Sequence, residues 1–358
     1  MGISTDFWRG RRVLLTGHTG FKGGWLSLWL QSLGAQVHGL ALAPATEPNL
    51  FSVARVGEGM AGSRFLDIRD IDDPRKAIGQ IEPEIIFHLA AQPLVRHSYV
   101  HPVETFATNV MGLVHLLESV RDAGSVRALV NVTTDKCYEN REWVWPYREA
   151  DPLGGHDPYS ASKACAELVT AAYRRSFLQD AGIGVATARA GNVIGGGDWA
   201  TDRLVPDILR SFGIGTPVRI RHPGAIRPWQ HVLEPLSGYL RLAEALVAGR
   251  AEAAEAWNFG PAEDDARAVE WIVGELARLW GPGASWERDP GNHVHEAGCL
   301  RLDSSKARVS LAWSPRWSLG EALCRSVDWE RRRLGGADMR AVCLEQIAEY
   351  GAWPPASP

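Results

Sequence analysis

Residues 12–23 read RVLLTGHTGFKG, an apolar run followed by a glycine-rich turn. The run Arg12–Thr16 has the character of a buried strand, and residues 24–33 place apolar side chains at helical spacing. The glycines between them have the spacing G-x-x-G-x-x-G and are Gly17, Gly20 and Gly23. Glycine permits a tight turn and lets backbone amides approach a pyrophosphate, and the helix start adds free N–H groups. The stretch predicts a dinucleotide-binding turn, with a plain strand–helix connection as the alternative.

The alternation of strand and helix continues through the first half of the chain. Its pattern predicts further strands at residues 36–41, 85–91, 128–133 and 184–190, and helices at residues 108–123 and 159–179. Strands that alternate with helices in this way run parallel and are covered on both faces. The order therefore predicts an α/β fold, a Rossmann-type doubly wound parallel sheet whose ligands lie at the carboxyl ends of the strands.

The amino-acid composition changes after about residue 190, where glycine and proline become frequent. We expect residues 1–190 to form the dinucleotide-binding domain and residues 191–350 to form a smaller mixed α/β domain that binds the substrate. Residues 224–258 are expected to return to the first domain, because residues 233–246 are strongly helical in pattern. The length of 358 residues agrees with two domains at ~100–200 residues each.

Composition and net charge indicate a globular protein and argue against several kinds of partner. Hydrophobic residues make up 45% and charged residues 22%, a typical globular balance. The net charge of −4 argues against a nucleic-acid or membrane-surface partner, and no apolar run reaches the roughly 18 residues of a membrane span. Residues 1–10 lack the apolar core of a signal peptide, and the five scattered cysteines fit reduced thiols. We expect a cytoplasmic protein.

The end of the second strand departs from the usual dinucleotide pattern. A carboxylate about 20 residues after the glycines ordinarily holds the adenosine ribose, but residues 39–42 read GLAL. No arginine that would bind a 2′-phosphate follows closely, so the residues alone leave NAD and NADP both open. Asp67 and Ile68, after a third strand, are candidates for holding the adenine edge; a solvated strand end is the alternative.

Tyr159 and Lys163 lie four residues apart at the start of the long predicted helix, and therefore on one face. An ammonium beside a phenol favours the phenolate, and an oxidised nicotinamide adds further positive charge. The spacing therefore predicts that Tyr159 acts as a base near neutral pH.

Thr134, Asp135 and Lys136 follow the strand at residues 128–133 and so stand at the ligand-facing edge of the sheet. The Thr134 hydroxyl is placed to share a proton network with Tyr159 and a substrate hydroxyl. Hydride transfer needs no further acid or base, so Asp135 and Lys136 suggest a second proton-transfer step; a solvated turn is the alternative.

These residues resemble the extended branch of the short-chain dehydrogenase/reductase superfamily, and more narrowly the CDP-glucose 4,6-dehydratases. The matching segments are GHTGFKG at 17–23, PNLF at 48–51, HLAAQ at 88–92, TTDKCY at 133–138, YSASK at 159–163, GNVIGGGDW at 191–199, IRPWQHVLEP at 226–235 and LDSSK at 302–306. They span almost the whole chain. The triplet TDK, where the related dTDP-glucose dehydratases have TDE, favours the CDP-sugar subgroup.

The resemblance implies an NAD that is oxidised back to its starting form in each cycle. Tyr159 would take the proton of the sugar 4-hydroxyl, Thr134 would hydrogen-bond that oxygen, and Lys163 would hold the nicotinamide ribose. Lys136 would take the proton at C5, directly or through a water, and Asp135 would protonate the departing 6-hydroxyl. The product would be CDP-4-dehydro-6-deoxy-glucose.

The resemblance also implies the ligand contacts and the assembly. Cofactor contacts would come from Gly17, Gly20, Phe21, Gly23, Leu89, Ala90 and Ala91, and sugar-nucleotide contacts from Asn192, Arg203, Arg227 and Asn258. The substrate would be CDP-glucose and the enzyme a homodimer or homotetramer, with helices 108–123 and 159–179 at the seam. Other readings are a different nucleotide-sugar 4,6-dehydratase, a 4-epimerase, or a non-catalytic NAD(H)-binding sensor. No metal is expected, because His293, His295 and Cys299 lack a fourth ligand.

Overall fold

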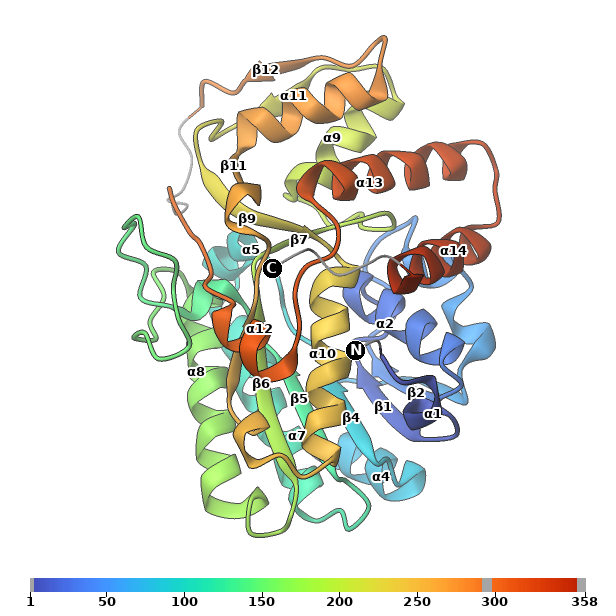
Figure 1. Cartoon of the computed structure of the whole chain (residues 1–358), viewed down its shortest axis with the longest axis vertical. Coiled ribbons are helices and arrows are strands. Elements are labelled where there is room, and N and C mark those ends of the chain that lie inside the picture. Colours follow the sequence, from blue (N-terminus) through green and yellow to red (C-terminus); the bar gives the residue numbers. More distant parts are fainter. Residues whose placement is uncertain (1–2, 292–297, 353–358) are drawn as a thin grey trace.

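A parallel sheet of seven strands forms the centre of the computed structural model, which describes residues 3–291 and 298–352 (Figure 1). The strand order is β10-β6-β5-β4-β1-β2-β3. In that order the strands are Ala256–Phe259, Gly184–Ala190, Ala128–Val132, Ile85–His88, Arg12–Thr16, Gln36–Ala41 and Gly62–Phe65. Strands β2 and β3 lie on one side of β1, and the strands that follow them in the chain lie on the other side. This order confirms the predicted Rossmann-type sheet.

Helices cover both faces of the sheet because its strands are apolar on both sides. In β1, Val13 and Leu15 belong to one buried cluster, and Leu14 belongs to another on the opposite face. The first face is covered by α2 (Phe21–Ser32) and α10 (Leu233–Val247), and α14 (Met339–Ala352) joins the same buried cluster by packing against α2. The second face is covered by α4 (Asp72–Ile81), α7 (Gly112–Arg121) and α8 (Pro158–Tyr173).

A smaller region lies beyond the carboxyl ends of these strands, in the upper part of Figure 1. It contains a three-stranded sheet of β11 (Ala266–Ala268), β9 (Ile226–His231) and β7 (Asn192–Ile194), and a pair of β12 (Trp286–Arg288) and β8 (Val218–Ile220). Its helices are α9 (Leu204–Gly213), α11 (Val269–Trp280) and α13 (Leu319–Leu334). A third buried cluster packs these elements together.

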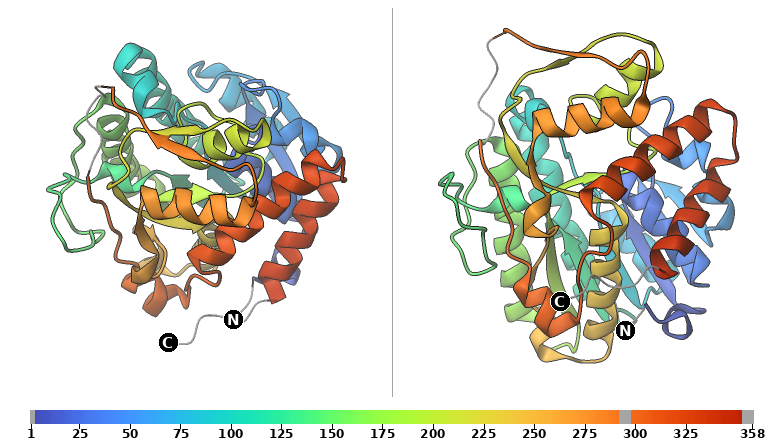
Figure 2. Two further views of the ribbon diagram at one scale, coloured as in Figure 1. Left: turned by 90° about the horizontal axis from the view of Figure 1, so that it is seen from above. Right: turned by 45° about the horizontal axis from the view of Figure 1, so that its top comes forward.

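The chain passes between the two regions more than once. Strand β9 pairs inside the smaller sheet, whereas α10 and β10, which follow it, lie with the large sheet. Helix α14 packs against α2, and Figure 2 shows α13 and α14 in red beside the blue N-terminal elements. The predicted boundary between two domains at about residue 190 stays a prediction.

Short helices complete the described chain. They are α1 (Thr5–Trp8), α3 (Leu50–Val53), α5 (Val95–Val100), α6 (Pro102–Phe106) and α12 (Ser305–Leu311); the 3-10 turns η1 (Val56–Gly59), η3 (Asp135–Cys137), η5 (Ala251–Ala253) and η6 (Glu263–Asp265); and the π-helical turns η2 (Ala107–Met111) and η4 (Arg174–Leu178).

Two boundaries differ from the sequence-based expectation in ways that matter for the site. The strand predicted at 85–91 ends at His88, because residues 89–91 leave the sheet and line a cavity. The helix predicted at residues 24–33 is α2, which begins at Phe21 rather than Gly24. The glycine-rich segment therefore leads directly into the start of α2. The π-helical turns η2 and η4 occupy the ends of the two other predicted helices, which periodicity does not distinguish from regular α-helix.

Candidate active site

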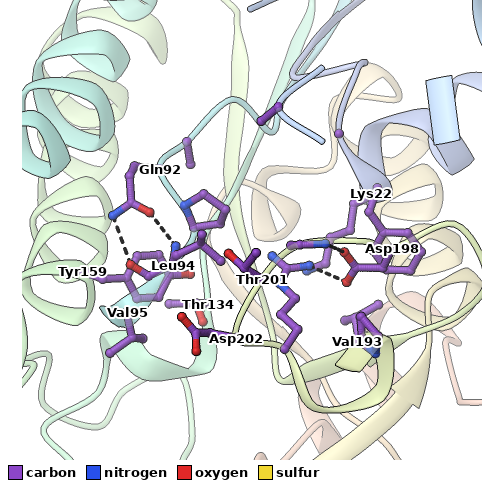
Figure 3. Close-up of a pocket in the computed structure, with 18 of the residues that line it drawn as sticks. Lys22, Gln92, Leu94, Val95, Thr134, Tyr159, Val193, Asp198, Thr201 and Asp202 are labelled. Atoms are coloured by element: carbon purple, nitrogen blue, oxygen red, sulfur yellow. Dashed lines mark hydrogen bonds and ion pairs between the residues drawn. The ribbon is translucent and has the colours of Figure 1, made fainter. Parts of the chain in front are cut away.

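A cavity of about 1080 Å³ lies between the carboxyl ends of the parallel strands and the smaller region. Its walls come from the glycine turn, the segments that follow β2, β3, β4 and β5, the start of α8, and residues on both sides of α9. Figure 3 shows Tyr159 and Thr134 on one side of the cavity and Lys22 and Asp198 on the other. The cavity therefore faces both regions of the chain.

The glycine turn leaves room where side chains would block it. Gly17 has a φ of +79°, and a Cβ there would stand 2.8 Å from the amide nitrogen of Ala90. A Cβ on Gly23 would collide with the carbonyl oxygen of Gly17. Gly20 caps α2 without a side chain, so the first amides of the helix stay available to a ligand. Gly17, Gly20, Phe21 and Gly23 all line the cavity, which fits a dinucleotide pyrophosphate.

The segment after β4 lies beside this turn. The Thr16 hydroxyl oxygen accepts hydrogen bonds from the amides of Leu89 and Ala90, each at 3.1 Å. Leu89, Ala90 and Ala91 line the cavity as expected.

Asp67 and Ile68 also line the cavity. The Asp67 carboxylate is already engaged by Arg69, whose Nε lies 2.8 Å from Oδ2, and these hydrogen bonds lower the pKa of Asp67. A contact of Asp67 with the adenine edge stays a prediction.

The predicted catalytic residues converge on the end of β5. Thr134, Asp135, Lys136, Tyr159 and Lys163 all line the cavity. The Thr134 hydroxyl donates to Oδ1 of Asp135 at 3.1 Å, and Lys163 Nζ donates to the carbonyl of Val132 at 3.2 Å. The tertiary fold thus brings the two sequence motifs, which are separated by more than 20 residues, to one wall.

Burial shifts the pKa of both members of the Tyr–Lys pair. It raises the pKa of Tyr159 to about 12, against the opposing effect of hydrogen bonding with Thr134. Burial also lowers the pKa of Lys163 to about 8, so its ammonium is itself held less firmly. Desolvation penalises the charged form of each group. A base role for Tyr159 stays a prediction, and it includes the positive charge that an oxidised nicotinamide would add.

Asp135 is a buried carboxyl group in this wall of the cavity. Burial raises its pKa, with the Lys136 ammonium opposing that effect. Among the described residues its Oδ2 has no hydrogen-bond partner, and the side chain is 2% exposed. A protonated carboxyl group here would offer its O–H to a ligand in the cavity.

Three of the four predicted sugar-nucleotide contacts reach the cavity. Asn192, Arg203 and Arg227 line it. Arg203 is paired with Asp198 at 2.7 Å, and the Arg227 side chain, 6% exposed, donates to the carbonyl of Ile226 at 2.9 Å. These two guanidinium groups are held in place before a ligand arrives.

Asn258 is the exception and corrects the sequence-based assignment. Its Oδ1 accepts from the Tyr138 hydroxyl at 2.7 Å, and its amide donates to the carbonyls of Tyr147 and Asp303 at 2.9 and 3.1 Å. It is fully buried and does not line the cavity. These hydrogen bonds hold the segments around Tyr138, Tyr147 and Asp303 to β10.

Two features of the site were not predicted from the sequence. Lys22 lines the cavity from the first turn of α2, and burial lowers its pKa to about 8. Asp202 accepts from Arg96 and Arg221, each at 3.0 Å, and so joins α5 to the segment after β8 at the cavity wall. Lys22 is visible inside the glycine motif, whereas the Asp202 bridge joins residues that only the fold brings together.

Two further expectations were that the protein has no metal site and no membrane-spanning helix. His293 and His295 lie outside the described residues, so the expected absence of a metal site stays a prediction. Across residues 3–291 and 298–352, no helix has the length and apolarity that crossing a membrane requires.

Comparisons with known proteins agree with this geometry. The sequence model of the NAD dependent epimerase/dehydratase family matches residues 13–260. The chain is 56% identical over 353 residues to a CDP-glucose 4,6-dehydratase from Salmonella typhimurium, covering 97% of this chain and 98% of that protein.

Solved structures share the fold. A UDP-glucose 4-epimerase from Thermotoga maritima matches with a TM-score of 0.78 and 23% identity, over 90% of this chain and 99% of that one. A dTDP-glucose 4,6-dehydratase from Streptomyces venezuelae, solved with NAD bound, matches with a TM-score of 0.76 and 26% identity, over 92% and 99% of the chains. With the glycine turn, the end of β5 and helix α8 all inside the matched residues, the chain belongs to the NAD dependent epimerase/dehydratase family.

Proposed function

We propose that this chain is a CDP-glucose 4,6-dehydratase, an NAD-dependent hydro-lyase that converts CDP-D-glucose to CDP-4-dehydro-6-deoxy-D-glucose. The observation that carries the proposal is that one cavity holds Tyr159 and Lys163 together with Asp135 and Lys136. A 4-epimerase needs the first pair only, whereas a dehydratase must also remove water across C5 and C6. The 56% identity to the Salmonella typhimurium enzyme supports CDP-glucose as the substrate.

The glycine turn and the segment after β4 are placed to hold the cofactor. NAD, when bound, supplies an acceptor for the hydride from C4 and a donor for its return to C6. The first amides of α2 and the glycines that keep the turn open would bind its pyrophosphate. Lys163, whose Nζ is 3.2 Å from the Val132 carbonyl, would hold the nicotinamide ribose.

Tyr159 and Thr134 would serve the oxidation at C4. Tyr159 takes the proton of the 4-hydroxyl as the hydride leaves, and Thr134 hydrogen-bonds the same oxygen. Because burial raises the pKa of Tyr159 to about 12, the phenolate depends on the positive charge that the oxidised nicotinamide brings. This coupling favours proton removal when the oxidised cofactor is in place.

Asp135 and Lys136 would serve the elimination. The 4-ketone makes the proton at C5 acidic, and Lys136 removes it, directly or through a water. Asp135 protonates the 6-oxygen so that it leaves as water. The burial that raises the pKa of Asp135 supports its role as the acid. Asn192, Arg203 and Arg227 would hold the sugar nucleotide, with the buried Arg227 suited to bidentate contact with a phosphate.

A panel of nucleotide sugars tests the proposal. Purified protein is incubated with CDP-, dTDP-, GDP- and UDP-glucose, and the 4-ketone is followed by its absorbance in alkali. Product from CDP-glucose alone is expected, and Tyr159→Phe provides the inactive control. Product from another nucleotide would keep the chemistry and change the substrate; no product from any of them would refute the function.

Two finer expectations are part of the proposal. We expect the protein to act in the cytoplasm and to assemble as a homodimer or homotetramer. Apolar side chains stand exposed along the α5, α6, η2, α8 and η4 surface, namely Tyr99, Val100, Val103, Phe106, Met111, Leu168 and Phe177. The helices of this apolar helix face contact one another, and a second copy of the chain would bury the face.

A further inference from the structure

Gly191 lies at the junction between the large sheet and the smaller three-stranded sheet. It follows the last residue of β6, precedes the first residue of β7 and lines the cavity. Strand β7 pairs in parallel with β9, with Asn192 opposite Trp229. At Gly191 the chain therefore leaves the strands next to the catalytic wall and enters the sheet that contains Arg227.

The space beside Gly191 is already filled by its neighbours. A Cβ atom there would stand 2.4 Å from Cγ of Pro228, 2.8 Å from the Pro228 carbonyl oxygen and 3.1 Å from Oδ2 of Asp135. The first two distances are shorter than the contacts that Cβ atoms make in folded proteins, and the third is tight. Gly191 is not among the glycines with a positive φ, so close packing and not backbone conformation requires glycine here.

The Asp135 carboxyl group forms one side of this contact. Its Oδ1 accepts the hydrogen bond from the Thr134 hydroxyl at 3.1 Å. Within residues 3–291 and 298–352 its Oδ2 has no hydrogen-bond partner, although the side chain is 2% exposed. Packing beside Gly191, rather than a second hydrogen bond from those residues, therefore fixes the position of Oδ2.

Ionisable groups act on this carboxyl group from four elements. They are Lys22 on α2, Lys136 and Cys137 in η3, Tyr159 on α8 and Arg227 on β9. The three cations among them favour the carboxylate, whereas exclusion of water favours the protonated acid. The close packing at Gly191 contributes to that exclusion, so it supports the form of Asp135 that the proposed elimination needs.

We propose that Gly191 is a positioning residue for the elimination step. Because it has no side chain, β9 and the Asp135 carboxyl group can both pack against it, and the acid stands at a fixed distance from the strand that carries Arg227. Gly191 acts through Asp135 and takes no part in the oxidation at C4. The inference rests on the proposed function, since the position of Asp135 matters only if it protonates the 6-oxygen.

Gly191→Ala tests the inference in a single turnover of CDP-glucose. The new methyl group displaces Oδ2 of Asp135, and a misplacement of about 1 Å can slow a reaction about 10²-fold. Tyr159 and Lys163 are unchanged, so NADH fluorescence is expected to rise at the wild-type rate and to decay about 10–100-fold more slowly. Gly274→Ala in α11 is the matched control: its added Cβ meets no atom within 4 Å, so neither rate should change.

A double-mutant cycle with Asp135→Ala separates this role from a general loss of structure. With no carboxyl group to displace, Gly191→Ala is expected to change the already slow NADH decay by less than about twofold, because groups that act together are not additive. If Gly191→Ala fails to fold, the cycle is measured in a Pro228→Ala background. That substitution removes Cγ, the atom that the methyl group would meet at the shortest distance.

Three results would overturn the inference. They are an unchanged NADH decay in folded Gly191→Ala, an equal slowing of NADH formation and decay, and the same slowing with and without the Asp135 carboxyl group. If the wild-type chain forms neither NADH nor product from CDP-glucose, the proposed function is overturned instead.

Discussion

The Nζ of Lys163 donates a hydrogen bond to the carbonyl oxygen of Val132 at 3.2 Å, and this contact fastens helix α8 to the carboxyl end of β5. Tyr159 lies one turn earlier on the helix, and Thr134 lies two residues beyond the end of the strand. The contact therefore sets the distance between the proposed base and the hydroxyl that assists it.

Replacing Tyr159 with Phe is expected to abolish the first proton transfer. General-base catalysis contributes about 10²–10⁴-fold, so formation of NADH from bound CDP-glucose should slow by at least that factor. The phenyl ring fills the same buried space, so the thermal midpoint should change little. NADH fluorescence in a single turnover measures the rate; an unchanged rate would remove Tyr159 from the mechanism.

Lys136→Ala is expected to separate oxidation from elimination. Tyr159 and Lys163 remain, so the first hydride transfer proceeds, but the proton at C5 stays in place and bound NADH accumulates. Rapid-quench analysis would show a 4-keto sugar that keeps its 6-hydroxyl. If Lys136→Ala forms no more bound NADH than Tyr159→Phe does, this assignment of roles is contradicted.

Asp135→Asn is expected to lower the activity and to raise the thermal stability at pH 8. A carboxyl group with a raised pKa binds more protons in the folded chain than in the unfolded chain, so it lowers stability as pH rises above its ordinary value of 3.8. Asparagine removes this cost, so the variant should melt higher than the wild type at pH 8, with the gap closing toward pH 4. Dehydration should slow about 10²–10⁴-fold. Calorimetric scans at the two pH values check the sign, and a variant that melts lower at pH 8 contradicts it.

Asn258→Ala and Arg227→Lys are expected to fail in different ways. Asn258→Ala removes three side-chain hydrogen bonds worth about 0.5–1.5 kcal/mol each, so it should lower the free energy of unfolding by about 1.5–4.5 kcal/mol and leave KM unchanged. Arg227→Lys keeps the charge but loses the planar fork, so KM for CDP-glucose should rise about tenfold or more. Denaturant unfolding and initial rates distinguish the two, and a large KM effect in Asn258→Ala would return that residue to the site.

Val103→Glu is expected to break the assembly. Val103 on α6 is 82% exposed in the single chain and stands on the apolar helix face. A charge there would be buried without a partner at the seam, so the variant should run as a monomer in light-scattering chromatography while the wild type runs as a dimer or tetramer. An unchanged mass would place the seam elsewhere.

The sequence by itself determined the sheet, the glycine turn and the identity of the reactive groups. Strand–helix alternation and the G-x-x-G-x-x-G spacing are local properties, and local backbone preference and burial act on contiguous residues. The strands at 36–41 and 184–190 accordingly have the bounds that their patterns predicted. Motif spacing likewise marked Tyr159, Lys163 and the Thr134–Lys136 triplet, all of which reach the cavity.

Only the tertiary structure decided how those groups are charged and which of them are free to bind. The pKa of Tyr159 rises rather than falls because desolvation depends on everything packed around the phenol, not on the lysine four residues away. Asn258 is occupied by partners that lie 45 to 120 residues away, and Asp202 bridges Arg96 and Arg221 across two regions of the chain. Such contacts follow from the packing of distant segments, and no pattern along the chain records them.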